Sequence, residues 1–309
     1  MNATIIIISL WCMNTLQLAT VAPPITSHRS VPASNRYDAT PTLAPTCLFK
    51  SGFEKGVTLE PPFTQGGGDW EQHIVGADIP GYSWPMNIWG ASGHLQVLVD
   101  SSLPVFDYLE NRIENTIGHT GKPTRALHML QYQKAEGWTQ DPYIIYNENN
   151  EDLQEDSDLY ISYWMKYPAD LKARLGPDGW FAFMEWKTCC NEDRIAMYVY
   201  EDLDESLYWY VQNDNETDDA PNHHIYWDEE SRTVPVPVGQ WFHVEVFLHR
   251  STGNDGRFLW AIDGQTVVDH HGPNKHTHPF NRFMPFTLYT NAEEIDIWID
   301  DIQIWDAIP

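Results

Sequence analysis

Positive charge is what this chain most clearly lacks. Its 309 residues contain 18 lysines and arginines against 44 aspartates and glutamates, which gives a formal net charge of −26 at pH 7. Nonspecific binding to nucleic acid requires a basic surface, so we expect no nucleic-acid partner. The negative field also opposes contact with an anionic membrane or a densely sulfated polymer. Solubility in salty or acidic surroundings explains the acidity equally well.

Cysteine is scarce as well. The chain has four cysteines, and Cys12 lies in an apolar N-terminal run, which leaves Cys47, Cys189 and Cys190. Three thiols without Cys-x-x-Cys spacing make a poor zinc site. In an exported protein we expect a disulfide between Cys47 and either Cys189 or Cys190, with a strained bond between the two neighbours as the alternative.

Long apolar runs are missing after the N-terminus. Residues 4–11 are apolar, and Ala19 and Ala22 are small residues that offer cleavage points, so residues 1–22 have the layout of a secretory signal peptide. No lysine or arginine precedes the run, which leaves a short membrane anchor as the alternative. No later stretch is long and apolar enough to span a bilayer. We therefore expect a secreted, extracellular protein without a membrane partner.

Residues 23–46 show no hydrophobic period and are rich in proline, serine, threonine and alanine. This composition predicts a flexible linker rather than folded structure. Residues 47–309 are expected to form one domain, because all-β domains of roughly 200–250 residues are common. We expect this domain to be monomeric.

Helical periodicity is nearly absent, and only residues 169–175 look like a helical turn. Alternation with period two, the signature of strands, recurs through the rest of the domain. Turn-forming clusters such as residues 176–179 separate the strand-like runs. The pattern predicts an all-β fold of two antiparallel sheets that face each other. The strand-like runs are residues 159–167, 180–187, 194–200, 206–214, 240–249, 256–264, 286–291 and 297–305.

The last four runs follow one another without a helix. The second of them ends in Asp263-Gly264, the third carries Tyr289, and the fourth contains Asp300-Asp301. This order resembles the concanavalin A-like jelly rolls that handle polysaccharides. That group includes laminin-G-like lectin domains, glycoside hydrolases, and the heparin-lyase-I-like and alginate-lyase-like polysaccharide lyases. The resemblance implies a jelly-roll β-sandwich and, given the acidic composition, a neutral or moderately anionic polysaccharide as partner.

A lyase that removes the proton next to a uronate carboxyl needs a group that neutralises the carboxylate, a base, and an acid for the leaving oxygen. Jelly-roll lyases supply these groups as Arg, Gln or Asn, His and Tyr. By this resemblance, residues 124–133 correspond to the Arg-bearing strand and offer Arg125, His128 and Gln131. In a regular strand His128 lies on the opposite face from Arg125, so the two act together only if a bulge intervenes.

Residues 286–291 resemble the late strand of the lyases that carries a tyrosine. The resemblance makes Tyr289 the expected proton-transfer residue and Asn291 a substrate-positioning residue. Period-two alternation places Glu185 and Lys187 on one strand face. Lys187 is then expected either to neutralise a carboxylate or to pair with Glu185.

Aromatic and polar residues also share a face in the run that ends at Asp214. Tyr208, Tyr210, Gln212 and Asp214 alternate there with apolar residues. Rings on such a face either line a sugar-binding groove or meet solvent. We expect the first three to bind substrate, and His224, in a nearby loop, to bind substrate and assist proton transfer.

The sequence leaves metal binding unknown. Histidines are dense in residues 269–278, but no regular spacing fixes them as ligands, so a solvated loop is favoured. The family resemblance implies that a structural Ca²⁺ is possible, with Asp300, Asp301 or Glu54 as ligands. No cofactor is expected to be required.

The leading hypothesis is a secreted polysaccharide lyase that cleaves a uronate-containing glycan by β-elimination. One alternative is a non-catalytic, lectin-like carbohydrate-binding domain whose rings hold the sugar. The other is a jelly-roll glycoside hydrolase that uses Glu185, with Glu245 as a conceivable second carboxylate.

Overall fold

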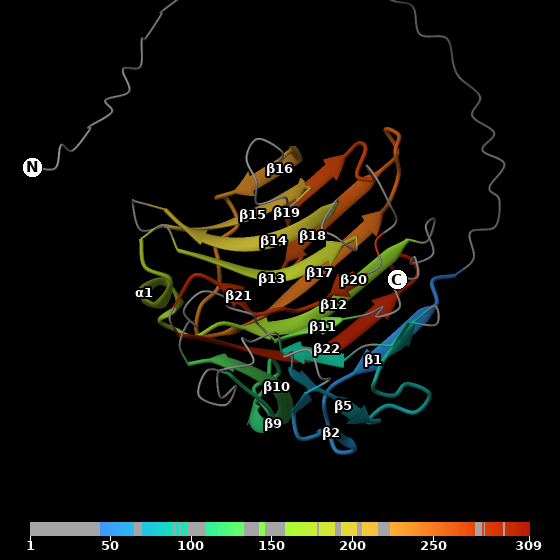
Figure 1. Ribbon diagram of the computed structural model, residues 1–309, viewed down its shortest axis with the longest axis vertical. Helices are drawn as coiled ribbons and strands as arrows, with labels where there is room; N and C mark the ends of the chain where they lie inside the picture. Colours follow the sequence, from blue (N-terminus) through green and yellow to red (C-terminus); the bar gives the residue numbers. More distant parts are fainter. Residues whose placement is uncertain are drawn as a thin grey trace, which may run out of the picture. The chain divides into compact units, whose positions relative to one another are not determined.

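Two antiparallel sheets packed face to face form a jelly-roll β-sandwich, and residues 44–309 make up one compact unit (Figure 1). The expected fold class is confirmed. The computed structural model describes residues 44–64, 70–88, 91–92, 94–97, 109–132, 142–145, 158–177, 179–188, 193–202, 206–215, 223–275, 280, 282–292 and 294–309.

The larger sheet has eight strands in the order β19, β18, β17, β12, β22, β10, β9, with β1 also paired to β22. Most of the strands predicted near the C-terminus belong to it. Their bounds are β1 (Cys47–Ser51), β9 (Leu109–Ile117), β10 (Pro123–Gln131), β12 (Leu159–Lys166), β17 (Trp241–His249), β18 (Arg257–Ile262), β19 (Gln265–His271) and β22 (Ile295–Trp305).

The second sheet has six strands in the order β16, β15, β14, β13, β20, and β21 pairs with the other part of β13. In Figure 1 the strands β13 to β16 lie in front of β17 and β18. Their bounds are β13 (Trp180–Lys187), β14 (Arg194–Glu201), β15 (Leu207–Asp214), β16 (Ile225–Ser231), β20 (Arg282–Met284) and β21 (Tyr289–Thr290).

Short elements complete the unit. The helical turn predicted before β13 is α1 (Leu171–Leu175). The N-terminal part contributes three small antiparallel groups, which are β2 (Val57–Leu59) with β5 (Ile74–Gly76), β6 (Asn87–Ile88) with β7 (Ala91–Ser92), and a four-stranded sheet of β3 (Phe63–Thr64), β4 (Trp70–Gln72), β8 (His94–Val97) and β11 (Pro142–Ile145). No helix of the described residues has the length and apolar character needed to cross a membrane.

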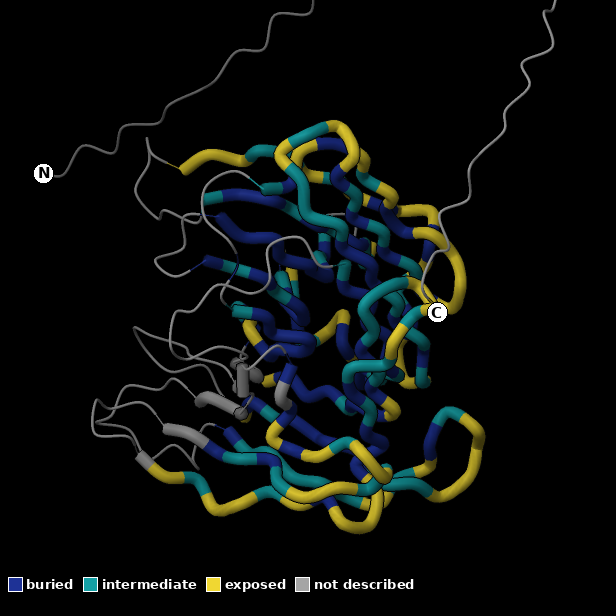
Figure 2. The backbone as a smooth tube through the Cα atoms, turned by 90° about the vertical axis from the view of Figure 1, so that its right-hand side faces the viewer, coloured by how far each residue is buried: buried dark blue, intermediate teal, exposed yellow. Residues whose placement is uncertain are grey.

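Aromatic rings fill the space between the two large sheets. Trp209 of β15 meets Trp260 of β18 edge to face, with ring centroids 5.1 Å apart, and Phe183 of β13 lies 5.6 Å from Trp260. All three side chains are fully buried, and Figure 2 shows dark blue, buried backbone where the layers meet. Such rings each bury about 150–250 Å², so they dominate the stability of the sandwich. These three aromatic residues therefore serve the core.

The run expected at residues 286–291 is mostly not a strand. Tyr289 and Thr290 form a two-residue strand opposite Ala182 and Phe181 of β13, and the backbone nitrogen of Thr287 donates a single hydrogen bond to Phe183 O at 2.9 Å. The register of β13 shifts between Ala182 and Met184, as at a β-bulge, and beyond the shift β13 pairs with β20 instead. A bulge bends its strand, which is why two short neighbours replace one long edge strand.

Cys47 has a free thiol. Its sulfur lies 3.4 Å from the carbonyl oxygen of Phe49 and 3.7 Å from that of Ile304. The two predicted disulfide partners, Cys189 and Cys190, lie outside the described residues.

Candidate active site

One face of the six-stranded sheet carries polar and aromatic side chains, and the other carries the core. Because strand residues alternate between faces, the neighbours of core residues such as Phe181, Ile195 and Trp209 point away from the core. We call the set directed away from the core the polar sheet face. Its members are Trp180, Ala182, Glu185 and Lys187 of β13; Arg194, Ala196, Tyr198 and Tyr200 of β14; Tyr208, Tyr210, Gln212 and Asp214 of β15; Asp228 and Glu230 of β16; Arg282 and Met284 of β20; and Tyr289 of β21.

Three cations form a row at one end of this face. Lys187 is the direct cross-strand partner of Arg282 on one side and of Arg194 on the other. Glu185 lies beside the row, with its carboxylate oxygens 3.7 Å from Lys187 Nζ and 3.5 Å from Arg194 Nη1. Directly opposed cross-strand residues have Cβ atoms only about 5 Å apart. The row therefore concentrates positive charge within the reach of one bound carboxylate.

Asp214 holds the guanidinium of Arg194 in place. Arg194 donates two hydrogen bonds to its carboxylate, from Nε to Oδ1 at 2.9 Å and from Nη2 to Oδ2 at 2.7 Å. Gln212 Nε2 donates to the same Oδ2 at 2.6 Å, and His223 Nε2 lies 3.2 Å from it. Asp214 is fully buried. Such a two-point pair fixes the plane of the guanidinium as well as its position.

Aromatic residues occupy the other end of the face. The ring of Tyr289 meets that of Trp180 edge-on at 4.8 Å, and Tyr198 lies 6.0 Å from Tyr210. Burial is the main cause that raises the pKa of Tyr198 and of Tyr210 above that of a free phenol. Both phenols are therefore protonated at neutral pH and can donate hydrogen bonds.

Two alanines lie among the cations and tyrosines of the face. Ala182 lies between Tyr289 and Tyr198 as their cross-strand neighbour. Ala196 lies between Arg194 and Tyr198 along β14 and next to Gln212 across the sheet. Both alanines are buried at the base of the face. The side chains of Tyr198, Trp180, Tyr200 and Tyr210 pack against these two alanines.

A family comparison decides the class of this protein. A family model described as polysaccharide lyase matches residues 119–303, which is more than half of the chain and includes every strand of the six-stranded sheet. The chain belongs to the polysaccharide lyase family. No curated protein sequence matches it.

Solved structures similar to this polysaccharide lyase include other polysaccharide-acting proteins. Alginate lyase Aly36B is 14% identical with a TM-score of 0.41, covering 58% of this chain and 80% of its own. The endo-beta-1,4-glucuronan lyase from the fungus Trichoderma reesei is 15% identical with a TM-score of 0.41, covering 64% and 90%. The endo-1,3-beta-glucanase from Streptomyces sioyaensis is 12% identical with a TM-score of 0.42, covering 91% and 100%.

Six of the predicted site residues of this polysaccharide lyase lie together. The alternation argument assigned those of β13 and of β15 to one face of each strand, and the structure adds that β14 joins the two strands and that β21, with Tyr289, pairs with β13. The six residues of the polar sheet face are Glu185, Lys187, Tyr208, Tyr210, Gln212 and Tyr289.

Three predicted residues lie in the other sheet, on β10. Arg125 donates through Nη1 to the backbone oxygen of Glu54 at 2.9 Å, and Gln131 Nε2 donates to that of Ala292 at 2.9 Å. Strand β10 pairs with β9 and β22, so these side chains serve the eight-stranded sheet. Arg125 and Lys187 therefore lie in different sheets.

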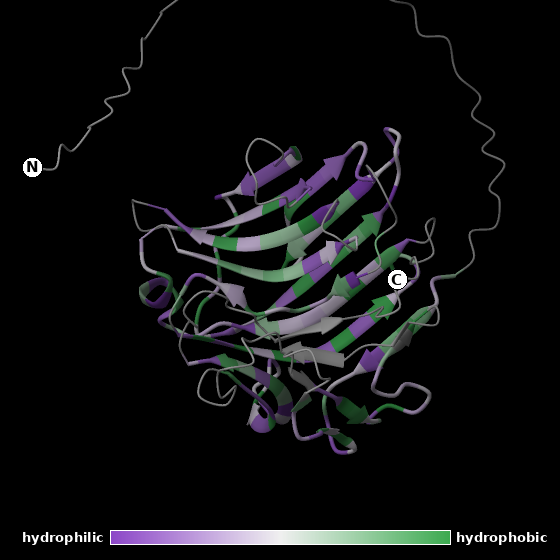
Figure 3. Ribbon diagram, viewed as in Figure 1, coloured by the Kyte–Doolittle hydropathy of each residue, from purple (hydrophilic) through white to green (hydrophobic). Residues whose placement is uncertain are grey.

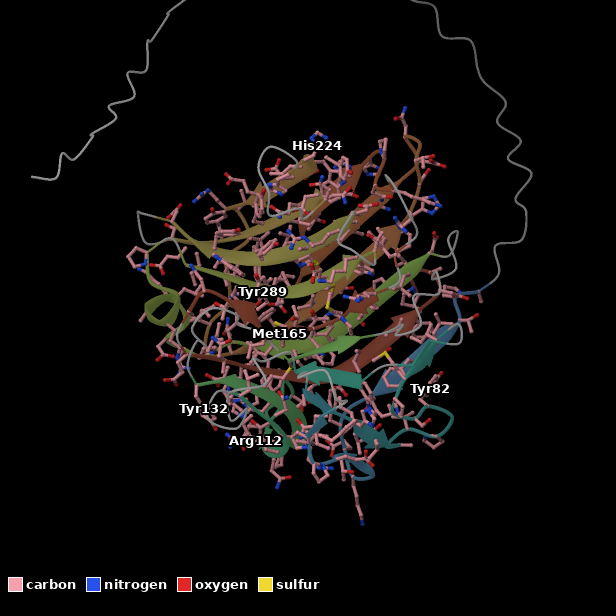
Figure 4. All side chains as sticks on the ribbon, viewed as in Figure 1. Tyr82, Arg112, Tyr132, Met165, His224 and Tyr289 are labelled. Atoms are coloured by element: carbon pink, nitrogen blue, oxygen red, sulfur yellow. The ribbon has the colours of Figure 1, made fainter. Side chains whose placement is uncertain are left out.

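The third residue of β10, His128, is buried among charged groups. Its ring nitrogens lie 2.8 Å from Glu114 Oε1 and 3.0 Å from Asp296 Oδ2, and the ring stacks on Trp298. Figure 4 labels Arg112, a neighbour of His128, near β9, whereas Tyr289 lies beside β13. His128 therefore does not reach the polar sheet face.

Asn291 and His224 have local roles in the structure. Asn291 Oδ1 accepts a hydrogen bond from the backbone nitrogen of Trp180 at 2.8 Å, which ties β21 to the start of β13. His224 is exposed before β16, and its backbone nitrogen donates to Asn215 Oδ1 at 2.7 Å. Neither side chain belongs to the polar sheet face.

The conceivable carboxylate pair of a hydrolase is not formed. Glu245 lies on β17 in the eight-stranded sheet and accepts a hydrogen bond from the hydroxyl of Tyr160 at 2.7 Å. Glu185 is on the other sheet, between two cations. Glycoside hydrolysis needs both carboxyl groups on either side of one sugar bond, about 5–9.5 Å apart.

Sequence reasoning missed other residues of the face, including two arginines and two tyrosines. Arg194, Tyr198 and Tyr200 alternate with core residues of β14 just as the polar residues of β15 do, so the same argument could have found them. Arg282 gave no such signal, because β20 has only three residues.

A carboxylate cluster lies at the other large sheet. Single ligand atoms of His119, Asp300 and Asp301 lie within 4.8 Å of one another. Burial, together with the neighbouring charge of Asp301, raises the pKa of Asp300 to about 7. Ca²⁺ takes oxygen ligands, so the two aspartates suit it and the imidazole does not. The third expected ligand, Glu54, instead accepts a hydrogen bond from Thr124 at 2.6 Å.

Calcium is expected to raise the melting temperature of the chelator-treated protein at pH 8. Ionised Asp300 lowers the free energy of unfolding there, because its folded pKa is above that of an unfolded aspartate. Asp300→Asn should remove this cost, so that the variant melts higher than the wild type in chelator and no longer responds to calcium. Thermal melts with and without calcium measure both effects. A calcium response that persists in Asp300→Asn would contradict this assignment.

Proposed function

We propose that this polysaccharide lyase cleaves a uronate-containing glycan by β-elimination on the polar sheet face. The observation that carries the proposal is the cation row beside tyrosine hydroxyls across Ala182 and Ala196. A uronate presents a carboxylate next to the carbon that loses its proton, so it requires positive charge and proton-transfer groups on the same surface. We also propose that the protein is exported, on the basis of the apolar run at residues 4–11.

The cation row would neutralise the uronate carboxylate. Removal of the C5 proton moves negative charge onto that carboxylate, and positioned cations stabilise the charge as it develops. Lys187 and Arg194 lie side by side, and the hydrogen bonds that Arg194 donates to Asp214 keep the guanidinium oriented before substrate arrives. The carboxylate of Glu185 lies 3.7 Å from Lys187 Nζ and 3.5 Å from Arg194 Nη1.

Tyr289 would transfer the proton. Its side chain is 40% exposed, more than that of any other tyrosine of the face, while its ring packs against Trp180. In the reaction a base takes the C5 proton, the C4–C5 double bond forms, and the C4–O4 bond breaks. An acid then gives a proton to the leaving O4 oxygen. Tyr289 takes one of these proton-transfer roles.

The test is incubation of the purified protein with uronate polysaccharides and neutral β-glucans. Ultraviolet absorbance follows the unsaturated uronate product, and a reducing-end assay follows chain cleavage by any route. β-Elimination is expected to raise both signals together on a uronate polymer. Reducing ends without absorbance would identify hydrolysis. Neither signal, with retention of the protein on an immobilised glycan, would identify a binding domain.

A further inference from the structure

The charges of the polar sheet face are divided between its two halves. Strands β20, β13 and β14 carry the cation row of Arg282, Lys187 and Arg194 against one carboxylate on the face, that of Glu185. This half is therefore positive overall. It is the half in which a uronate carboxylate is stabilised.

The half formed by β15 and β16 is acidic. These two strands contain no lysine or arginine. Asp214 is neutralised by Arg194, but Asp228 and Glu230 are exposed on the edge strand β16. Figure 3 shows most of β16 in the hydrophilic colour. A carboxylate on a sugar above this half meets like charge.

A second cation beside the acidic half, Arg232, is already engaged. Arg232 follows β16 and forms ion pairs with Asp202 and with Glu230, the latter at 3.2 Å. Its guanidinium also lies 3.9 Å from the ring centroid of Tyr208. Two carboxylates offset its single charge, so it does not reverse the sign of this half.

Neutral sugars suit the acidic half. Tyr208, Tyr210 and Gln212 provide ring surface, a hydroxyl and an amide on β15. Asp228 accepts a hydrogen bond from the hydroxyl of Tyr210 at 3.3 Å and has further lone pairs for sugar hydroxyls. Carboxylates that repel a uronate are good acceptors for the hydroxyl groups of an uncharged sugar.

We propose that the substrate is a glycan in which a uronate is followed by a neutral sugar, rather than a homopolymer of uronates. The uronate lies over β20, β13 and β14, and the neutral sugar lies over β15 and β16. This inference rests on the proposed function, and it names the substrate class of the same site.

The experiment compares kcat/KM on two groups of polymers by ultraviolet absorbance. Polyglucuronate and alginate carry a carboxylate on every sugar, whereas hyaluronan, unsulfated chondroitin and gellan place uncharged sugars next to glucuronate. The wild-type enzyme is expected to prefer at least one polymer of the second group. Raising the salt concentration should reduce the difference in kcat/KM between the two groups of polymers, because salt screens exposed charges.

The double variant Asp228→Asn, Glu230→Gln tests the cause. It removes two charges but keeps amide oxygens as acceptors for hydroxyls, so kcat/KM on polyglucuronate should rise roughly tenfold relative to that on the preferred polymer. The matched control Glu60→Gln, Glu294→Gln removes two exposed charges outside the six-stranded sheet and should leave the ratio unchanged.

The outcomes separate this inference from the proposed function. The inference is overturned if the enzyme prefers polyuronates to all mixed polymers. It is also overturned if the Asp228 and Glu230 changes do not alter the ratio of kcat/KM on polyglucuronate to kcat/KM on the preferred polymer. Either result leaves the proposed β-elimination intact. No unsaturated product from any polymer overturns both. The inference is supported if the wild-type enzyme prefers a mixed polymer and if this preference is smaller in the double variant but unchanged in the control.

Discussion

Replacing Tyr289 by phenylalanine is expected to lower kcat on a uronate polysaccharide by about 10²- to 10⁴-fold, which is the usual worth of a positioned proton-transfer group. The change removes one oxygen atom and leaves the ring, whose centroid lies 4.8 Å from that of Trp180. KM should stay within a few-fold of the wild-type value for the same reason. Steady-state ultraviolet assays at saturating and limiting substrate give both constants.

Tyr132→Phe is the matched control. Tyr132 is also an exposed tyrosine, and it directly follows β10 in the other sheet. Its hydroxyl donates a hydrogen bond to Glu110 of β9. This variant should retain wild-type kcat. If Tyr289→Phe also retains it, another group on the polar sheet face transfers the proton, and Tyr210→Phe would be the next variant to measure.

The strand pattern predicted much of this site because each strand could be analysed alone. Alternation along β15 assigned Tyr208, Tyr210 and Gln212 to one face, and burial in the structure confirms that their neighbours Trp209 and Val211 are core. Such assignments depend only on the two-residue period of a strand. They do not depend on knowing which strands are neighbours.

The alternation pattern did not predict which sheet each strand joins. Arg125 precedes four consecutive buried residues, and its strand β10 pairs with β9 and β22 in the eight-stranded sheet. A strand's own residues do not say which partner it hydrogen-bonds. Partners are set by long-range packing, and the same limit hid the adjacency of Lys187 and Arg282, which join through a three-residue strand.

The family resemblance supplied what the pattern could not. It selected Tyr289, although its strand β21 has only two residues and no alternation to analyse. It also selected β10, where the structure finds local contacts for each of the three chosen side chains. A short-motif resemblance therefore supports a residue's role best where the structure independently places that residue on the same face as other reactive groups.

The cation row makes Lys187 the second residue with a large expected effect. Lys187→Ala should lower kcat/KM by about 10²-fold or more, because it removes a preorganised charge from the middle of the row between Arg282 and Arg194. Lys187→Arg keeps the charge at that position and should recover part of the loss. Lys187 also pairs with Glu185, so the folded fraction of each variant is measured by urea titration and used to correct its activity.

Arg125→Ala distinguishes a site on the polar sheet face from a site on β10, the strand that the resemblance to the lyases selects. Arg125 donates to the backbone oxygens of Glu54 and Val57 at 2.9 and 3.3 Å, so its loss should reduce stability. Activity per folded molecule should not change, since no residue of the polar sheet face contacts this side chain among the described residues. Loss of corrected activity in Arg125→Ala but not in Lys187→Ala would move the carboxylate-binding group to β10. The reverse result would place the carboxylate-binding group on β13, in the middle of the cation row.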